Sequence, residues 1–564
     1  MRAALLLLAP ALLIASFTVA RPEPLPAPTL PPSFDGASAV ATDTELARDY
    51  PSRVPGTAAA DGAARWYAGK LAVYGLRALE DTWEEEIPGV GRARLRNLVT
   101  VVPGTTDYAI VVVAHRDNTG ASPGANDNAS GTAALIELAR GYATSGTVTE
   151  RPEPEHTLVF LSSDGGAYGG LGAERFASTS PLRSKVLAVV SLDGLAGNAP
   201  PRLELAGFEP RSPAPALVRT ASVRIAEQTV TEPSRPGWLA QLVDLGVPFG
   251  YGEQGPFLAR GISAVRIATA PDGRADTGDV PEILNAGGFA RLGRAAESLL
   301  SSLDAGIALS GGTASYVYLG DRAIRGWAIE LVLLASLPPF LIGAIDLFTR
   351  SRRRGLALRG AWLSLRTRLG MWLWAGGVVW LGALIGVFPR DGTVTPPPDS
   401  PVVSRWPVAG LLVLAVVLAA GWWPARRRLA PRGHVTPEDE LAGYAVSLLA
   451  LGAIAIATAA VNPHALLFLV PSLYAWLWLP QVHARSGWAR DALYGIGLIG
   501  PVLALVSIAE QLGLGLDAPL YVTGLITAGF VPWAAVLALL AWAAVASQLG
   551  ALAAGRYVPR HSDR

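Results

Sequence analysis

Residues 108–117 read Tyr-Ala-Ile-Val-Val-Val-Ala-His-Arg-Asp, seven apolar and mostly β-branched residues followed by three polar ones. A short apolar run of this kind predicts a strand that is buried on both faces, as in the middle of a parallel sheet. His115 and Asp117 then follow that strand at its carboxyl end, where the sites of open α/β sheets gather. This stretch therefore indicates both the fold and the place where the chemistry is expected.

The segments on either side of this run repeat the pattern. Further buried strands are expected at 96–102, 157–161 and 186–192, and helices at 58–75, 129–142, 171–177 and 281–303. Strands that alternate with helices predict an α/β sandwich around a mostly parallel or mixed central sheet. We assign this domain to residues 35–310.

A second, all-helical region is expected after Gly320, where the residues become predominantly apolar. This region contains seven apolar runs, and each is long enough, or nearly so, to cross a bilayer as a helix. The seven runs are 324–348, 369–389, 406–423, 441–461, 464–480, 492–509 and 519–546. They predict a seven-helix transmembrane domain over 324–548, which a linker at 311–323 precedes and a basic tail at 549–564 follows.

The start of the chain predicts a membrane anchor and a stalk. Residues 1–20 contain one Arg and a long apolar run, which fits a signal peptide or a signal anchor, and we favour an uncleaved anchor. Residues 21–34 are rich in proline, so we expect a semi-rigid spacer between the membrane and the next domain.

Charge is distributed unevenly along the 564 residues, although the net charge is only +1. Residues 21–320 hold 33 acidic and 25 basic residues, whereas the rest of the chain holds 12 acidic and 21 basic ones. Seven arginines lie in 350–368 and four in 424–440. Because cytoplasmic loops are enriched in Lys and Arg, we expect these segments and the C-terminus in the cytoplasm. The α/β domain is then outside, on a plasma membrane that we expect to be bacterial.

Composition also excludes several classes of function. The chain has no cysteine, so it has neither disulfides nor thiolate chemistry. Only 16% of its residues are charged, which argues against a nucleic-acid-binding or disordered chain. The expected partners are the lipid bilayer and an exported ligand such as a peptide N-terminus.

Three residues at expected strand ends could hold a metal ion. His115 follows the apolar run at 108–114, Asp127 lies in the segment PGANDNASG at 123–131, and Asp193 follows the strand at 186–192. One histidine and two aspartates form a plausible zinc-binding set.

These residues lie in motifs that resemble a known family. The segments AHRD, PGANDNASG, FLSSDGG, GLGAERFA, SLDG and GPFLARGISAV occur in the order found in the co-catalytic di-zinc aminopeptidases of peptidase family M28. That family also contains glutamate carboxypeptidases and glutaminyl cyclases, and the resemblance covers roughly residues 60–305. It implies that His115, Asp127 and Asp193 hold the first zinc, that Asp127 bridges to a second, and that Asp117 orients His115.

The chain departs from the family where catalysis and the second zinc are expected. The family's general base corresponds to Gly166, its second-zinc glutamate to Ala167 and its late histidine to Asp272. Glycine cannot accept a proton and alanine cannot bind a metal. Because a missing general base costs about 10²–10⁴-fold in rate, we expect little or no peptidase activity by the usual mechanism, and at most one zinc.

Some carboxylates near the expected site could replace the missing base. Asp164, Glu174, Glu253 and Asp272 lie in bordering segments, and Glu253 is the best candidate. His156 follows Glu155 and precedes a strand, so we expect a surface residue and no ligand. On the alignment alone, Gly166→Glu, Ala167→Glu and Asp272→His together should restore a second zinc.

The sequence leaves three functions open. The first is a membrane-bound relative of zinc aminopeptidases that is catalytically impaired and acts in ligand binding or regulation. The second is an active aminopeptidase that uses one zinc and a substitute base on exported peptides. The third is a transporter with an exported sensor domain, although the expected spans contain few ionisable residues, with Glu330 and Asp346 the main ones in the first.

Overall fold

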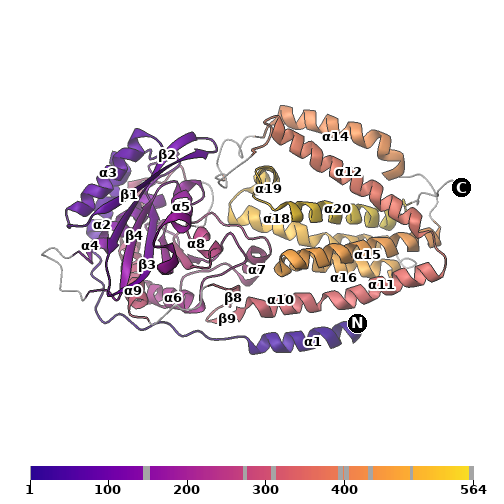
Figure 1. Cartoon of the computed structure of the whole chain (residues 1–564), viewed down its shortest axis with the longest axis horizontal. Helices are drawn as coiled ribbons and strands as arrows, with labels where there is room; N and C mark the ends of the chain where they lie inside the picture. The colour runs from indigo at the N-terminus through magenta and orange to yellow at the C-terminus, as the bar shows by residue number, and fades with distance from the viewer. Residues whose placement is uncertain are drawn as a thin grey trace.

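A computed structural model gives the fold. It describes residues 2–143, 153–270, 276–306, 313–390, 398, 406–429, 436–482 and 487–557. Figure 1 shows an elongated molecule with an α/β domain at one end and a bundle of long helices at the other.

The α/β domain is built on a mixed seven-stranded sheet with the strand order β1-β2-β4-β3-β5-β7-β6. The four central strands β4, β3, β5 and β7 are parallel, and antiparallel strands flank them on both sides. The strands are β1 (Ala78–Ile87), β2 (Gly91–Val102), β3 (Thr106–His115), β4 (His156–Ser163), β5 (Val186–Leu192), β6 (Arg202–Glu204) and β7 (Ser263–Ala268). The predicted α/β fold with a mixed sheet is thus confirmed.

Strand β3 contains the apolar run that indicated the fold. Ile110 and Val112 point to one face of the sheet and Val111 and Val113 to the other, and all four are buried in two separate hydrophobic clusters. The alternation follows from the two-residue period of a strand. Both faces of the sheet are therefore covered, as the uninterrupted apolar run predicts.

Helices cover the two faces unequally. The larger cluster packs under α2, α3, α4, α6 and α9, and the smaller one under α5 and α8. The helices are α2 (Gly36–Asp49), α3 (Ala58–Ala72), α4 (Gly131–Arg140), α5 (Leu171–Thr179), α6 (Pro215–Thr229), α7 (Trp238–Gly246), α8 (Gly255–Ala259) and α9 (Ala286–Asp304). All four helices expected in this domain are present, with bounds that shift by a few residues.

The proline-rich segment and the predicted linker are both packed on the α/β domain. In the proline-rich segment, the Leu25 N–H donates to Thr220 Oγ1 at 2.9 Å, and the Phe34 N–H donates to Glu297 at 2.7 Å. In the predicted linker, β8 (Tyr316–Leu319) and β9 (Arg322–Arg325) form a hairpin, and Tyr318 exchanges hydrogen bonds with Gln241. The described parts of both segments are therefore held against the domain by hydrogen bonds.

The C-terminal region is a bundle of apolar helices. They are α10 (Gly326–Ala335), α11 (Leu337–Arg353), α12 (Leu358–Leu384), α14 (Val408–Leu429), α15 (Pro437–Val461), α16 (Leu466–Val482), α17 (Gly487–Gly497), α18 (Ile499–Gln511), α19 (Ala518–Thr527) and α20 (Trp533–Ala553). The N-terminal helix α1 (Arg2–Phe17) lies beside α10 (Figure 1).

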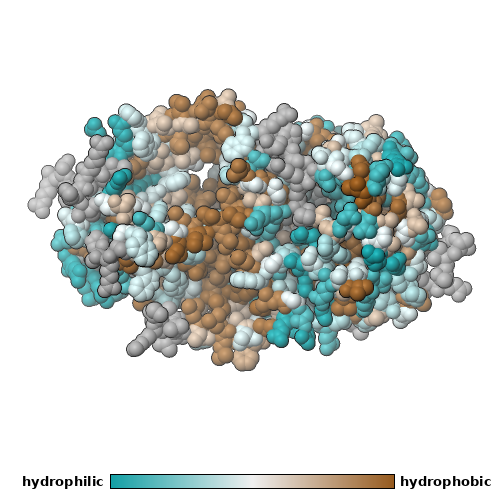
Figure 2. All heavy atoms as spheres, turned by 180° about the vertical axis from the view of Figure 1, so that it is seen from behind, coloured by the Kyte–Doolittle hydropathy of each residue, from teal (hydrophilic) through white to brown (hydrophobic). Residues whose placement is uncertain are grey.

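Among the described residues, five helices are long and apolar enough to cross a membrane, or six if the bent pair α17–α18 forms one span. This number differs from the seven spans expected. The run at 369–389 lies in α12, which also carries three arginines, and the run at 519–546 divides into the short α19 and α20. Figure 2 shows a brown apolar band between two hydrophilic ends. The chain is an integral membrane protein.

Candidate metal centre

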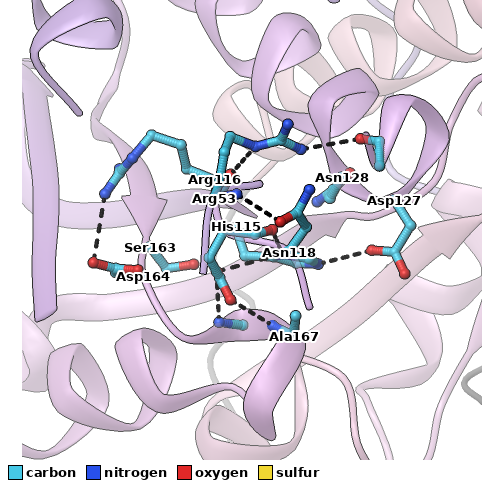
Figure 3. Close-up of polar contacts among 12 residues, drawn as sticks. Arg53, His115, Arg116, Asn118, Asp127, Asn128, Ser163, Asp164 and Ala167 are labelled. Carbon is cyan, nitrogen blue, oxygen red and sulfur yellow. Dashed lines mark hydrogen bonds and ion pairs between the residues drawn. The ribbon is translucent and has the colours of Figure 1, made fainter. Parts of the chain in front are cut away.

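The centre lies at the carboxyl end of β3, where His115 is the last residue of the strand. Its ring is buried, and Nε2 lies 3.2 Å from Asp127 Oδ1 and 3.6 Å from Asp193 Oδ1. One ligand atom from each of the three residues lies within 4.8 Å of the others. The structure thus brings together the three residues that the sequence singled out, and Figure 3 shows His115 facing Asp127.

The ring of His115 is held from its other nitrogen. Nδ1 lies 3.1 Å from the Asp117 carbonyl oxygen and 3.5 Å from Asp117 Oδ1, so Nε2 is left to face the two aspartates. This arrangement, in which a second residue fixes the ring and its tautomer, is usual for metal-binding histidines. The donor set of one imidazole nitrogen and two carboxylate oxygens fits a zinc ion.

The turn that carries Asp127 is held by hydrogen bonds to Asp279 and to the end of β5. It runs over Ala125–Ser130 and leads into α4. Asp279 accepts the backbone N–H groups of Asn126 and Asp127 at 2.6 and 2.8 Å. The side chain of Asn128 donates to the Leu192 carbonyl at 2.8 Å, which ties the turn to the end of β5. Asp127 is left 56% exposed and is the open side of the centre.

Arg53 holds the residues just before the turn that carries Asp127. It is fully buried and donates to the backbone carbonyls of Arg116, Pro123 and Gly124. The negative charges of Asp117, Asp43 and Asp127 lie near it. Burial nevertheless lowers the pKa of Arg53 to about 10, so its charge persists at neutral pH. Arg53 therefore holds the segment just after His115 and the residues just before the turn that carries Asp127 to one buried cation.

The electrostatics favour a bound proton or cation at His115. Burial by itself would lower the pKa of His115, but contacts with Asp117, Asp127 and Asp193 outweigh this effect and raise it well above the usual value. Burial would likewise raise the pKa of Asp193, but the positive charges of Arg266 and His115 bring it below its usual value. Asp193 is therefore ionised and ready to bind a cation.

A buried arginine is the largest feature that the sequence analysis missed. Arg266 lies in the middle of β7, and its Nε is 2.9 Å from Asp193 Oδ2. Both side chains are at least nine-tenths buried. This contact occupies one oxygen of Asp193 and leaves Oδ1 toward His115. A lone arginine inside the apolar segment SAVRIA could have indicated this ion pair, because a buried charge needs a partner of opposite charge.

The loop at the missing catalytic positions is closed around Asp117. Asp117 Oδ1 accepts the Gly166 N–H at 2.8 Å, and Asp117 Oδ2 accepts the Ala167 N–H at 3.1 Å (Figure 3). A Cβ atom at Gly166 would lie 2.1 Å from His115 Cβ. Position 166 therefore has no room for any side chain in this backbone, and Ala167 offers no ligand atom. Asp272, the third replaced position, lies outside the described residues.

The three substitute carboxylates that lie within the described residues differ in their surroundings. Glu174 is bound by Arg260 at 2.8 Å on the surface, so it does not serve the centre. Asp164 accepts the Arg96 N–H at 2.9 Å, and burial raises its pKa to about 6. Glu253 is fully buried and accepts a hydrogen bond from Ser163, whose Cα pairs with that of His115 across β3 and β4. Burial raises the pKa of Glu253 to about 7, which nearby His115 partly offsets.

His156 is not the surface residue that we expected. It is 6% exposed at the first position of β4, and its backbone N–H and ring both contact Asp304. It does not belong to the metal centre, because His156 and Ser163 stand at opposite ends of the same strand. The polar residue Glu155 before it indicated exposure, but the C-terminal end of α9 covers the start of β4.

Comparison with known proteins relates the α/β domain to one family. Residues 97–289 match the model of Peptidase family M28. The α/β domain is similar to that family over these residues, and we refer to it as the M28 domain. Transferrin receptor protein 2 of Rattus norvegicus is 40% identical over 89 residues, which are 15% of this chain and 11% of that protein. A Schizosaccharomyces pombe protein named "Putative endoplasmic reticulum metallopeptidase 1" is 34% identical over 104 residues, 18% of this chain and 12% of that one.

These matches span only about a tenth of the two curated relatives. Among solved structures, the zinc aminopeptidase BSAP from Bacillus subtilis is 14% identical. That alignment covers 47% of this chain and 94% of BSAP with a TM-score of 0.38.

Proposed function

We propose that the M28 domain holds one divalent metal ion at His115, Asp127 and Asp193 and binds a ligand there with little or no peptide hydrolysis. The closed loop at Gly166 and Ala167 carries this proposal. Where the family resemblance implies two glutamates, this loop offers two backbone N–H groups, and both are already used by Asp117. A zinc ion in this centre would act as a Lewis acid toward a ligand carbonyl or amine.

The charge around Asp193 supports a single ion. The guanidinium of Arg266 occupies Oδ2 and contributes a fixed positive charge in a buried setting. Like charges repel strongly where water does not screen them, so a second cation close to Arg266 would be disfavoured. Asp127 is the one exposed member of the three, and a ligand would reach the ion from its side.

We include the class of ligand in the proposal, and we take it to be a peptide because the domain resembles peptidases. A metal that polarises a carbonyl and lies beside the ionised Asp193 fits the terminus of a peptide. The relative named as a transferrin receptor carries a receptor's name and not that of a peptidase, which supports a binding role for this type of domain.

We further propose that the domain lies outside the cytoplasm. α11 ends in Arg350, Arg352 and Arg353, and α14 carries Arg426 and Arg427 near its end. Both helix ends point away from the α/β domain in Figure 1. The positive-inside tendency then assigns that end of the bundle to the cytoplasm. Fusions of a periplasmic and a cytoplasmic reporter after Ala553 test this, and an active periplasmic reporter there would contradict it.

The decisive test uses the full chain purified in detergent. We expect elemental analysis to find about one zinc per chain, Asp127→Ala to lose it, and aminoacyl anilides to remain uncleaved. Turnover that a chelator abolishes and Asp127→Ala removes would overturn the proposal.

A second candidate function is a single-zinc aminopeptidase in which Glu253 is the general base. It is favoured by the burial of Glu253 and by its pKa of about 7, which is suited to accepting a proton at neutral pH. In this case Glu253→Gln would abolish turnover and leave the zinc content unchanged. If the domain only binds its ligand, as in the first proposal, neither the unmodified chain nor Glu253→Gln hydrolyses the substrate.

A further inference from the structure

Helix α7 of the M28 domain exposes apolar side chains. Trp238 is 57% and Leu239 is 37% exposed, and Leu242 one turn later is half-buried. The single charged residue of the helix, Asp244, faces inward and accepts a hydrogen bond from Gln511 at 2.6 Å. A helix on a water-exposed surface normally turns its apolar residues toward the core. The outer face of α7 is thus unlike that of an ordinary surface helix.

The opposite side of α7 is packed on the ends of membrane helices. Asn462, between α15 and α16, donates to the carbonyls of Leu245 and Gly246 at 2.9 and 3.2 Å. A Cβ on Gly246 would lie 2.7 Å from the ring of Phe468, so the backbones approach closely there. Gln511 is the last residue of α18. α7 therefore lies at the level where three apolar helices end or begin.

Exposed tryptophans mark the same level elsewhere in the bundle. Trp327 begins α10, Trp533 begins α20, and Trp406 precedes α14 and donates to Asp517 next to α19, and all three are 46% or more exposed. A second exposed group lies at the other ends of the helices and comprises Trp362, Trp422, Trp423, Trp478 and Trp488. α12 exposes three more along its length, Trp372, Trp374 and Trp380. Tryptophan collects at the two membrane–water interfaces, so these groups mark both of them.

We propose that α7 is an interfacial helix, with Trp238 and Leu239 inserted at the boundary between lipid headgroups and acyl chains. The M28 domain would then be attached to the bilayer by a helix of its own as well as by its chain connections. The occupant of this face is the bilayer itself, because α7 contacts the ends of membrane helices through Asn462 and Gln511, at the level of the first tryptophan group. The proposal holds whether or not the domain hydrolyses peptides.

The attachment would also place the metal centre near the membrane surface. Five residues lie between Val247 and Glu253, so the two are at most about 20 Å apart along the chain. Along it, Phe249 packs edge-on against Tyr521 of α19, and the Tyr251 hydroxyl donates to the Ala167 carbonyl at 2.8 Å. Ligands that reach this centre most readily would be polypeptides tethered to the same bilayer.

The absence of cysteine makes a direct test simple. Leu239→Cys and Trp238→Cys, each spin-labelled and reconstituted in phosphatidylcholine vesicles, report their depth through collisions with oxygen and with a water-soluble nickel chelate. Val413→Cys, 56% exposed on α14, gives the lipid reference, and Val73→Cys, 78% exposed at the end of α3, gives the aqueous one.

We expect the oxygen-to-nickel accessibility ratio at both α7 positions to lie between the two references. A ratio equal to that of Val73→Cys would place α7 in water and overturn the proposal. Shielding from both reagents would show a protein contact there and would also overturn it. The zinc content of these variants should match that of the unmodified chain, so this result is independent of the proposed metal function.

Discussion

Gly166→Ala is the substitution for which the structure predicts the largest local effect. The added Cβ would lie 2.1 Å from His115 Cβ and 2.4 Å from Cγ. Real Cβ atoms do not approach so closely, so either the loop or His115 must move. A loop shift also weakens the hydrogen bond from the Gly166 N–H to Asp117, which is 2.8 Å long in the native fold.

The magnitude follows from these two costs. Overpacking a buried site costs about 1–3 kcal/mol. Weakening a buried hydrogen bond to a charged group costs roughly 1.5–3 kcal/mol at most. Together they predict a loss of about 2.5–6 kcal/mol and a fall in melting temperature on the order of 10 °C for a domain of this size. Because Asp117 positions His115, zinc affinity should also fall by about 10–100-fold.

The assay is a thermal melt and a zinc titration of the full chain in detergent. Gly69→Ala is the matched control, because it lies in α3 and an added Cβ there meets nothing within 4 Å. It should be neutral or stabilising by up to about 1 kcal/mol, as expected for alanine in a helix. If Gly166→Ala melted and bound zinc like the control, the closed-loop reasoning would be refuted.

The same geometry corrects an expectation from the alignment. Gly166→Glu with Ala167→Glu would not simply rebuild a second zinc site, because the first of these side chains has no room beside His115. Restoring the two glutamates would require the loop to move away from Asp117 as well.

Three further predictions concern the charges. Arg266→Gln leaves the buried Asp193 without its cation and should cost about 3–5 kcal/mol in unfolding free energy, measured by denaturant titration. Zinc binding should release a proton and tighten as pH rises, because the raised pKa of His115 keeps it protonated without metal; calorimetry in buffers of different ionisation enthalpy detects this. Burial raises the pKa of Asp244 to about 7, so the domain–bundle contact should weaken as pH rises from about 4 to 7. Asp244→Asn should remove that pH dependence in thermal melts and keep the hydrogen bond to Gln511.

The central strands were predictable from residue type alone. β5 (Val186–Leu192) has the predicted bounds, and β3 differs from its prediction by no more than two residues at either end. Both are apolar, β-branched and buried on two faces, so local preference and tertiary setting agree. β1 (Ala78–Ile87) was not predicted, because its acidic residues mask the strand pattern. It is an edge strand, where charged side chains can remain in water.

The sequence by itself determined the mixed α/β sheet, the apolar membrane region, and the three candidate metal ligands, two of which lie at strand ends. Those features depend on periodicity and on the fact that parallel strands end at one edge of a sheet. Only the tertiary structure decided that Arg266 lies on Asp193, that Gly166 packs against His115, and that α7 sits on the ends of the membrane helices. Each of these is a contact between residues far apart in the chain, and such contacts depend on packing and on unscreened charge inside the fold, which no local pattern specifies.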